Sequence, residues 1–600
     1  IVADTLTWAR GRHTFKGGMS FNAYQNNTKY DFYINGDFYF SGEGGGIGSG
    51  NDMADFLLGL PDEFLQFPLA PSDIRSKYFS GFFQDEWRLA RNLVLTLGVR
   101  YEYSSPKLDT RGRSFSLGLG RQSQVFTKAP PGLLFPGDPN APKGANLPDK
   151  NDWAPRIGFA WSPTAKTSIR GGAGMFYDIL KAEDNLQFNG QAPFFGFVDL
   201  YFDPPSRNPT APLNIMSQPF VAADQPNPFP SKPPAKDIDF GKEGFLPVGG
   251  GGVYFVDPHL RTPYALQYNL SVQRELLHGM VLDVAYVGSG SRKLTGLVDA
   301  NPFILGTTRR IFNAQPGIAS AASFSYLDEF RNVGNGNYNS LQVGLTQRAR
   351  QVPVLGKVEF LQLSYTWQKS IDTMSGFRER SSRVPYYNPK QFRAASDFDL
   401  TQNFVLSAAW ELPFNRWGGP KGLLGGWTLY PVLTLHTGFT LDVYSQISRS
   451  RTRTGPSAAG DPNMVRADLI KANVEVYDPH REQTIANRSG NFYFDRTAFS
   501  TARYSAATYD AVNNPALRTY GTLGRNAFRG PGRVNLDLAL AKFFPIWKER
   551  IKGEFRAEAF NLANHAQWGS PNTNISSAQF GQITSTLDPR IVQLALRIRF

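Results

Sequence analysis

The 600-residue sequence predicts an all-β protein, and more particularly a transmembrane antiparallel up-and-down β-barrel. Three observations predict this fold. Apolar and polar residues alternate along long segments, aromatic residues recur at the ends of those segments, and short connections alternate with long ones. The low charge of 19% and the mean hydropathy of −0.33 agree with it, because alternating barrel strands average to a mildly hydrophilic chain.

The alternation is strict. From Leu93 to Tyr103, leucine, valine or tyrosine occupies every second position, whereas Arg100 and Glu102 lie at positions between them. Successive side chains of a strand point to opposite faces, so this period marks one apolar face. Several runs reach the roughly 9–11 residues that a tilted strand needs to cross a bilayer. The same pattern recurs at 264–273, 341–346, 361–368, 534–540 and 592–600.

Aromatic residues lie where these apolar faces end. An interfacial girdle of a membrane barrel has tyrosine and tryptophan at this position. In a soluble β-sandwich the same residues would be ordinary core, but the strand lengths favour the membrane. The residues are Trp87, Tyr101, Tyr103, Trp161, Tyr177, Tyr264, Trp367, Trp410 and Trp427.

Short and long connections alternate along most of the chain, as they do between the periplasmic turns and extracellular loops of outer-membrane barrels. We therefore interpret residues 1–600 as one barrel domain. The long loops are rich in proline and glycine, and we expect them to lack a core of their own and to form recognition surfaces. They lie near 104–151, 178–262, 291–337, 370–399, 444–532 and 563–588.

The first 90 residues are less regular. A hairpin of strands 5–10 and 13–24 is predicted across Gly11 and Arg12, and a short helix or turn at Asn51–Leu60. Further barrel strands are predicted at 37–41, 63–69 and 77–87. The count is then about 17 strands, with the first and last running in the same direction. Because single-chain bacterial barrels have even strand numbers, we expect at least one strand to be missing before Ile1.

Other classes of protein are disfavoured. No apolar run approaches the roughly 18 residues of a transmembrane helix, and the chain has no cysteine. The six histidines lack metal-ligand spacing and the glycine runs lack a phosphate-loop lysine. We predict no catalytic, cofactor or metal site, and no enzyme. The net charge of +13 permits nucleic-acid binding, but no nucleic-acid motif accompanies the scattered basic residues.

A barrel of this size encloses a wide lumen that is either plugged or filled with water. Charged residues on the polar face of the strands are candidates for contact with a plug or a passing solute, and a solvated, self-paired wall is the equally weighted alternative. The candidates are Arg100, Glu102, Arg170, Glu411, Asp537, Glu554, Arg556, Glu558, Arg597 and Arg599.

Several segments resemble a known family. Gly81–Leu89 with Leu97–Tyr103, and Trp153–Trp161, resemble the barrel of TonB-dependent receptors. The segments Thr5–Lys16, Ala54–Leu60 and Glu558–His565 are more particularly similar to the Oar-like branch, whose members carry a carboxypeptidase-regulatory-like domain ahead of the plug. The resemblance implies a 22-stranded barrel with an N-terminal plug and a TonB box. The plug, the TonB box and the first strands are absent from this sequence.

The C-terminal strand adds to the resemblance. The apolar residues Val592, Leu594, Leu596 and Ile598 alternate up to a terminal Phe600. This pattern is similar to the β-signal that the barrel-assembly machinery recognises, although it is also what an ordinary last strand looks like.

The leading hypothesis is an outer-membrane TonB-dependent receptor for energised uptake of a bulky ligand, such as an oligosaccharide, a peptide or a metal chelate. The alternatives are a passive porin-like channel, a surface adhesin or secretion-related barrel without transport, and a soluble carbohydrate-binding β-protein. Expected partners are outer-membrane lipid and lipopolysaccharide, the TonB complex through the missing N-terminal part, and the unknown ligand. Arg449, Arg451 and Arg453 hint weakly at an anionic ligand.

Overall fold

The computed structural model describes most of the chain. The residues outside the description are 31–32, 42–47, 68–69, 180–193, 195–197, 203–214, 228–235, 240–252, 278, 303–309, 317–326, 353–355, 377–383, 385, 387–388, 417–419, 445–465, 501–521, 548–550 and 576. Arg449, Arg451 and Arg453, which we expected to favour an anionic ligand, therefore lie outside the described residues.

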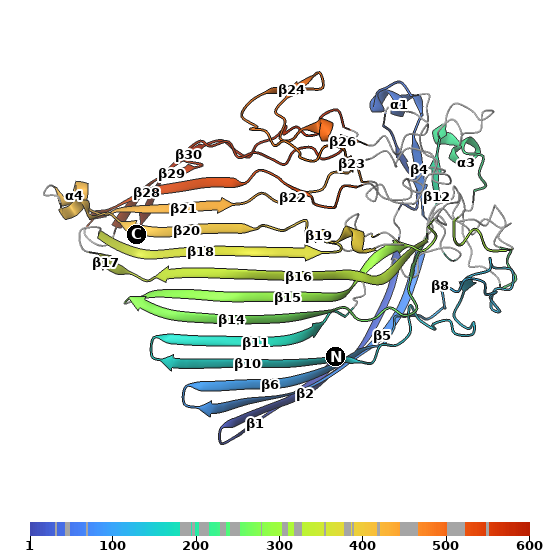
Figure 1. The fold of residues 1–600 in the computed structure, drawn as a ribbon, viewed down its shortest axis with the longest axis horizontal. Coiled ribbons are helices and arrows are strands. Elements are labelled where there is room, and N and C mark those ends of the chain that lie inside the picture. The colour runs from blue at the N-terminus through green and yellow to red at the C-terminus, as the bar shows by residue number, and fades with distance from the viewer. Residues whose placement is uncertain are drawn as a thin grey trace.

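One large antiparallel sheet dominates the molecule. Each long strand pairs with the next long strand of the chain, which is the up-and-down topology that the sequence predicts (Figure 1). The long strands are β1 (Val2–Arg10), β2 (His13–Tyr30), β5 (Ala70–Ala90), β6 (Leu93–Ser104), β10 (Asp152–Thr164), β11 (Thr167–Tyr177), β14 (Tyr264–Leu277), β15 (Met280–Asp299), β16 (Leu327–Gln347), β18 (Gly356–Asp372), β20 (Gln402–Glu411), β21 (Trp427–His436), β28 (Arg533–Trp547), β29 (Ile551–Phe560) and β30 (Ile591–Arg599).

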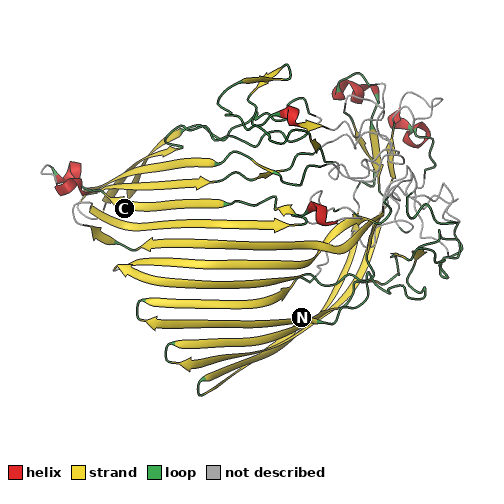
Figure 2. Ribbon diagram, viewed as in Figure 1, coloured by secondary structure: helices red, strands yellow, loops and turns green. Residues whose placement is uncertain are grey.

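Short strands extend this sheet or lie outside it (Figure 2). Those joined to it are β7 (Leu108–Asp109), β13 (Val253–Val256), β17 (Arg350–Val352) and β19 (Ala394–Ala395), and β13 alone among them pairs in parallel, with β16. The separate small sheets contain β3 (Asp37–Tyr39), β4 (Glu63–Gln66), β8 (Ser116–Leu117), β9 (Leu133–Leu134), β12 (Val198–Tyr201), β22 (Thr440–Leu441), β23 (Asp468–Leu469), β24 (Gln483–Ile485), β25 (Arg488–Gly490), β26 (Phe499–Ser500) and β27 (Phe528–Arg529).

Helices are few and short. They are α1 (Asp52–Leu58), α3 (Pro219–Ala222), α4 (Lys421–Leu424) and the 3₁₀ turns η3 (Ile215–Ser217), η6 (Pro389–Phe392), η7 (Pro413–Arg416) and η10 (Arg496–Ala498). In the described part of the chain, none of them has the length and apolar character needed to traverse a membrane. The helix α1 confirms the helical alternative for Asn51–Leu60: Asn51 caps its first turn and Gly59 ends it with a left-handed φ of 72°.

The register of the strands separates two faces. Leu97 pairs with Ile157, and Leu270 pairs with Gly171 and Tyr286, so apolar residues of neighbouring strands adjoin on one face. This face is open, since Leu270 is 48% exposed and Leu594 is 69% exposed. A lipid-facing wall explains that exposure, because the bilayer takes the place of a protein core.

The ends of the sheet differ strongly. Short turns join the strands at the left end in Figure 1, and the long connections with α1, α3, β4 and β12 gather at the right end. By the usual rule for bacterial barrels, the short-turn end is periplasmic and the long-loop end is extracellular.

Two predictions of strand assignment are wrong. We expected 37–41 and 63–69 to be barrel strands, but β3 and β4 form a separate sheet with β12. The reason is that β2 and β5 pair directly from His13↔Trp87 to Tyr30↔Ala70, which leaves no place for strands between them. Without this pair the sheet has fifteen long strands in place of about 17, a number that is still odd.

The predicted loop at 291–337 is also too wide. Strand β15 continues to Asp299 and β16 begins at Leu327, and the two remain paired up to Asp299↔Asp328. Register shifts near Leu294 let the pair continue beyond the lipid-facing segment. There Leu297 and Phe330 are buried against Leu260 instead of facing lipid. In this part of the strands, an apolar residue therefore indicates burial against a loop and not contact with lipid.

Among the described residues, the two outermost strands of the sheet have a partner strand on one side only. Strands β1 and β30 lie wholly within the described residues, and no pairing joins them to each other. Every residue of both strands is exposed.

Candidate functional site

The candidate lumen residues share one face of the sheet. Successive pairings, such as Ala160↔Arg170, Glu411↔Thr428 and Ala539↔Glu558, place all of them on the face opposite the lipid-facing leucines. They spread over β6, β11, β20, β28, β29 and β30 and do not gather into one site.

Arg100 and Glu102 form one local network on β6. The Arg100 Nε donates to Glu102 Oε1 at 2.9 Å, and its Nη2 donates to Ser80 Oγ at 2.8 Å and Tyr78 Oη at 3.0 Å. The hydroxyl of Tyr78 donates to Glu102 Oε1 at 2.6 Å. These groups satisfy one another across the β5–β6 pair, as the self-paired wall requires.

A second network joins β29 to β30. Glu554, whose side chain is 9% exposed, lies 3.7 Å from an Arg597 nitrogen and 3.4 Å from an Arg599 nitrogen. Arg556 pairs with Glu558 at 2.5 Å, and its guanidinium lies 4.9 Å from the centre of the Tyr430 ring. The last strand is therefore joined to the wall by ion pairs as well as by backbone hydrogen bonds.

The remaining candidates are more isolated. Asp537 accepts hydrogen bonds from Asn535 and from the backbone of Asn561. Glu411 lies in register with Lys357, and Arg170 is exposed on the inner face. The two functional interpretations of these side chains, contact with a plug or solute and a self-paired wall, stay predictions.

The residues of the proposed C-terminal signal lie on the lipid-facing side of β30. Their exposed fractions run from 47% at Ile598 to 69% at Leu594, and Phe600 is 96% exposed. Recognition of Val592, Leu594, Leu596, Ile598 and Phe600 by the assembly machinery stays a prediction.

The long loops do have cores, contrary to our expectation. Three successive loops meet in an aromatic cluster, in which Phe126 and Phe135 have ring centres 4.6 Å apart and Phe194 packs on Phe135 at 6.0 Å. Phe255 and Phe312 complete it and are almost fully buried. The sequence did not predict this because the contributing residues are far apart and have no shared period.

Further clusters hold the other loops. Phe64, Leu200 and Phe202 pack where the β2–β5 and β11–β14 connections meet, under α3. Phe494 and Phe580 join the β21–β28 connection to the β29–β30 connection. The described loop residues therefore form packed structure of fixed shape above the barrel.

Asp138 fixes a tight turn in this layer. Its carboxylate accepts hydrogen bonds from Ser123 Oγ at 2.7 Å and from the backbone nitrogens of Gln124, Val125 and Phe135 at 2.6, 3.1 and 2.8 Å. Burial opposes ionisation, but these four donors outweigh it and hold the pKa of Asp138 below its ordinary value of 3.8.

Acid is expected to open this turn. Because the folded-state pKa of Asp138 is depressed, its contribution is complete above the unfolded pKa and is lost as pH falls through the lower folded value. Pepsin cleavage within 123–138 should rise steeply below about pH 4. Asp138→Asn, which cannot ionise, should show a much smaller rise when each rate is divided by the rate at which pepsin cleaves an unfolded substrate at the same pH. An equal normalised rise in both proteins would contradict this assignment.

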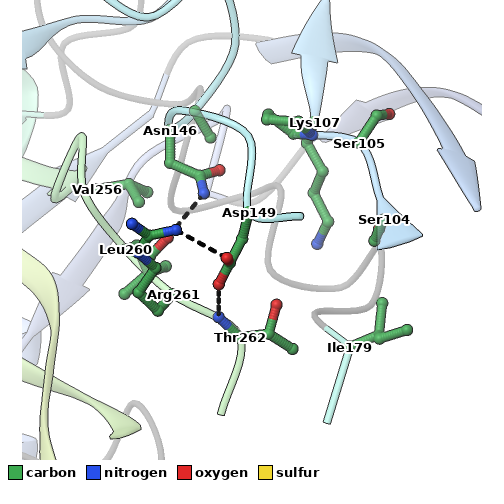
Figure 3. Close-up of a pocket in the computed structure, with 12 residues that line it drawn as sticks. Ser104, Ser105, Lys107, Asn146, Asp149, Ile179, Val256, Leu260, Arg261 and Thr262 are labelled. Carbon is green, nitrogen blue, oxygen red and sulfur yellow. Dashed lines mark hydrogen bonds and ion pairs between the residues drawn. The ribbon is translucent and has the colours of Figure 1, made fainter. Parts of the chain in front are cut away.

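A small pocket with both apolar and polar lining lies beside the outer end of β6 (Figure 3). Asp149, whose side chain is 7% exposed, accepts hydrogen bonds from Arg261 Nη1 at 2.7 Å and from the Thr262 nitrogen at 3.1 Å. The Thr262 hydroxyl donates to Asp152 at 2.8 Å. Figure 3 shows Lys107 extending toward the same space from the opposite side.

The pocket offers hydrogen-bond donors and a carboxylate together. Arg261 is 48% exposed at its side chain, so part of its guanidinium is accessible to a polar group of a ligand. Sequence reasoning missed this pocket, since its residues come from four separate segments and match no motif. In the described residues, no group of three or more histidine, aspartate and glutamate side chains is arranged to hold a metal ion.

A charged clamp joins the end of β18 and the β18–β20 connection to the β21–β28 connection. The Arg525 side chain is 4% exposed and pairs with Asp372, which is 7% exposed, and with Asp397 at 2.8 Å. Its Nε also donates to the Phe392 carbonyl at 3.1 Å. Nearby, Arg529 pairs with the fully buried Asp399. We call the group Asp372, Asp397, Asp399, Arg525 and Arg529 the arginine clamp.

Comparisons with known proteins agree with this architecture. The family model described as "Outer membrane beta barrel domain" matches residues 1–593. No curated protein matches the chain.

Several solved structures are similar. The outer membrane transporter YddB from Escherichia coli has 9% sequence identity and a TM-score of 0.45, with 99% of this chain and 52% of that chain covered. The ferric enterobactin receptor of Pseudomonas aeruginosa in complex with enterobactin has 11% identity and a TM-score of 0.42, with 100% and 53% covered. The ferric citrate transporter FecA has 8% identity and a TM-score of 0.40, with 100% and 53% covered. The chain thus spans about half the length of each.

Proposed function

Because this chain belongs to the outer membrane beta-barrel domain family, we propose that it forms the barrel of a TonB-dependent receptor that takes up a bulky ligand. The family assignment identifies the protein as an outer-membrane β-barrel. Energised uptake of a ligand is our proposal. In this proposal the TonB complex acts through a plug and a TonB box that belong to the complete protein. Assignment to the Oar-like branch is part of the same proposal and rests on the segments quoted above.

The packed extracellular layer is the observation that carries the proposal. Loops with buried aromatic cores and the arginine clamp present a shaped surface above the barrel mouth. A receptor needs such a surface, since recognition requires groups held at fixed positions. The pocket around Asp149 and Arg261 is one candidate subsite on it for a polar group of an oligosaccharide, a peptide or a metal chelate.

The unpaired edges of β1 and β30 support a larger barrel. In lipid, each unsatisfied backbone polar group costs several kcal/mol, so both edges need partners. Because the count of long strands is odd, β1 and β30 run in the same direction. We propose that an odd number of further strands closes the barrel with antiparallel pairing on both sides.

Energised uptake is tested with the complete protein in its own cells. Accumulation of maltoheptaose, a hexapeptide and ferric citrate, each radiolabelled, is compared between cells with and without the gene. The gene-dependent uptake of at least one probe is expected to stop when an uncoupler collapses the proton gradient or when TonB is deleted.

A second assay separates the passive-channel alternative. Liposomes containing the purified complete protein are placed in arabinose or in raffinose, and their swelling is recorded. A plugged receptor is expected to give no swelling with either sugar. Rapid swelling, together with uptake that an uncoupler does not affect, would make the protein a passive channel, and surface binding without any uptake would favour the adhesin hypothesis.

A further inference from the structure

Tryptophan residues mark the periplasmic edge of the lipid-facing wall. Trp8, Trp87 and Trp161 each lie within four residues of a short turn, and Trp410 and Trp427 flank the turn between β20 and β21. Trp8 is 51% exposed and Trp161 is 41% exposed. Exposed indole rings at one height of a barrel indicate the boundary between hydrocarbon and headgroups.

The short turns at this boundary are basic. Every turn whose residues the structure describes carries arginine or lysine, except the β14–β15 turn, of which only Gly279 is described. Acidic side chains also lie at this end: Glu275 accepts a hydrogen bond from the Gly279 nitrogen at 3.2 Å, and Glu411 is the last residue of β20, in register with Lys357. The exposed basic side chains are Arg10, Arg12, Arg88, Arg91, Lys166, Arg348 and Arg416.

One of these cations lies beside a lipid-facing tryptophan: the Arg10 guanidinium is 5.7 Å from the centre of the Trp8 ring. Lys542 Nζ is 5.4 Å from the centre of the Trp427 ring, but Lys542 is 8% exposed and donates to the Leu423 carbonyl at 3.0 Å. The Arg10 contact therefore puts an accessible positive charge at the level of the interface.

Within the described residues, several charges of the basic turns are not neutralised by an acidic side chain. At the loop end, buried arginines such as Arg113, Arg310 and Arg525 have carboxylate partners. At the turn end, Arg10, Arg91 and Lys166 have no ion pair within the described part of the chain. A partner with negative charge is therefore expected outside the protein.

We propose that the basic short-turn rim binds the phosphate groups of anionic phospholipids in the periplasmic leaflet. The side chains lie at the height of the headgroups, next to rings that sit at the same interface, and long basic side chains readily extend along apolar surface to reach phosphate. A basic residue near an anionic membrane surface strengthens binding by roughly fivefold. This inference concerns the lipid surface and is independent of what the barrel transports.

The test measures lipid preference directly. The full chain is reconstituted with equal amounts of phosphatidylcholine and phosphatidylglycerol, extracted in mild detergent, and the retained lipids are counted by native mass spectrometry. The test variant is Arg10→Gln/Arg91→Gln/Lys166→Gln/Arg348→Gln. The matched control removes four exposed basic residues from the loop end: Lys128→Gln/Lys143→Gln/Lys150→Gln/Arg481→Gln. Heat-modifiable gel migration verifies that each protein is folded.

The wild-type protein and the loop-end control are expected to retain phosphatidylglycerol preferentially. The turn-end variant is expected to lose that preference by about tenfold or more, and added salt should weaken it in the wild type. Equal retention of both lipids by the wild type would overturn the proposal, as would an unchanged preference in the turn-end variant. If a poly-glutamate peptide binds the wild type in preference to phosphatidylglycerol, the partner is an acidic protein and the lipid proposal fails.

Discussion

Replacing Arg525 by alanine is expected to loosen the loops around the barrel mouth at a cost of about 3–5 kcal/mol in local stability. Arg525 and Asp372 are both almost completely buried. Removing the arginine leaves the aspartate charge in a low-dielectric site without a partner, which costs more than the pair itself contributes. Hydrogen exchange in peptides covering 368–375, 394–399 and 523–529 should therefore accelerate by several orders of magnitude, whereas strands β6 and β10 should be unaffected.

Two further variants make this test specific. Arg481→Ala removes an arginine that is 83% exposed and only 3.8 Å from Asp478, and it should change stability by no more than about 0.5 kcal/mol. The double variant Arg525→Ala/Asp372→Ala should lose less than the sum of the single variants, because the unpaired charge is then absent. Unchanged exchange in Arg525→Ala would show that the arginine clamp does not hold these loops.

The same substitution at two neighbouring residues of one strand should reduce the stability of the protein by very different amounts. Leu270 and Asn269 are adjacent in the middle of β14 and point to opposite faces. Leu270→Arg places a charge against hydrocarbon and should cost about 2–4 kcal/mol if the site lies near the bilayer midplane. Asn269→Arg places it on the inner face, opposite Gly172 and Val287, and should cost less than 1 kcal/mol.

The measurement is a urea titration of the complete protein folded into phosphatidylcholine vesicles, followed by tryptophan fluorescence. A similar loss for the two variants would contradict the separation into a lipid-facing and an inner face. Greater damage by Asn269→Arg would mean that the faces are reversed.

The sequence allowed the long strands to be predicted because their period is a local property imposed by lipid on one side. Segments such as 93–103 and 592–600 have that period throughout, and both are strands of the barrel. Residues 25–30 of β2 and 70–76 of β5 lie outside the strands that we predicted. Beyond the lipid-facing segment, neither face of the β2–β5 pair contacts lipid, so apolar and polar residues need not alternate. The pairing that extends to Tyr30↔Ala70 therefore produces no period-two pattern in the sequence.

The loop layer could not be predicted for a different reason. Arg525 contacts Asp372, which is 153 positions away in the chain, and Phe135 packs on Phe194 from another loop. Contacts of this kind depend on how the strands bring distant segments together. The inner-wall charges were found from their alternation with apolar residues, but only the strand register shows which of them face one another, as Glu554 and Arg597 do.

Because the strands differ in length, the extracellular rim of the barrel is higher on some strands than on others. At roughly 3.3 Å per residue, the 21 residues of β16 reach about twice as far as the 10 residues of β20 or β21. The rim is therefore uneven: paired strands extend furthest at β2–β5 and at β15–β16, and loop structure completes the lower side at β20 and β21. Moving the extended ends of β15 and β16 would break their outer pairs up to Asp299↔Asp328. We therefore expect any widening of the entrance for a large solute to occur at the low side, where loops can shift without breaking the hydrogen bonds between strands.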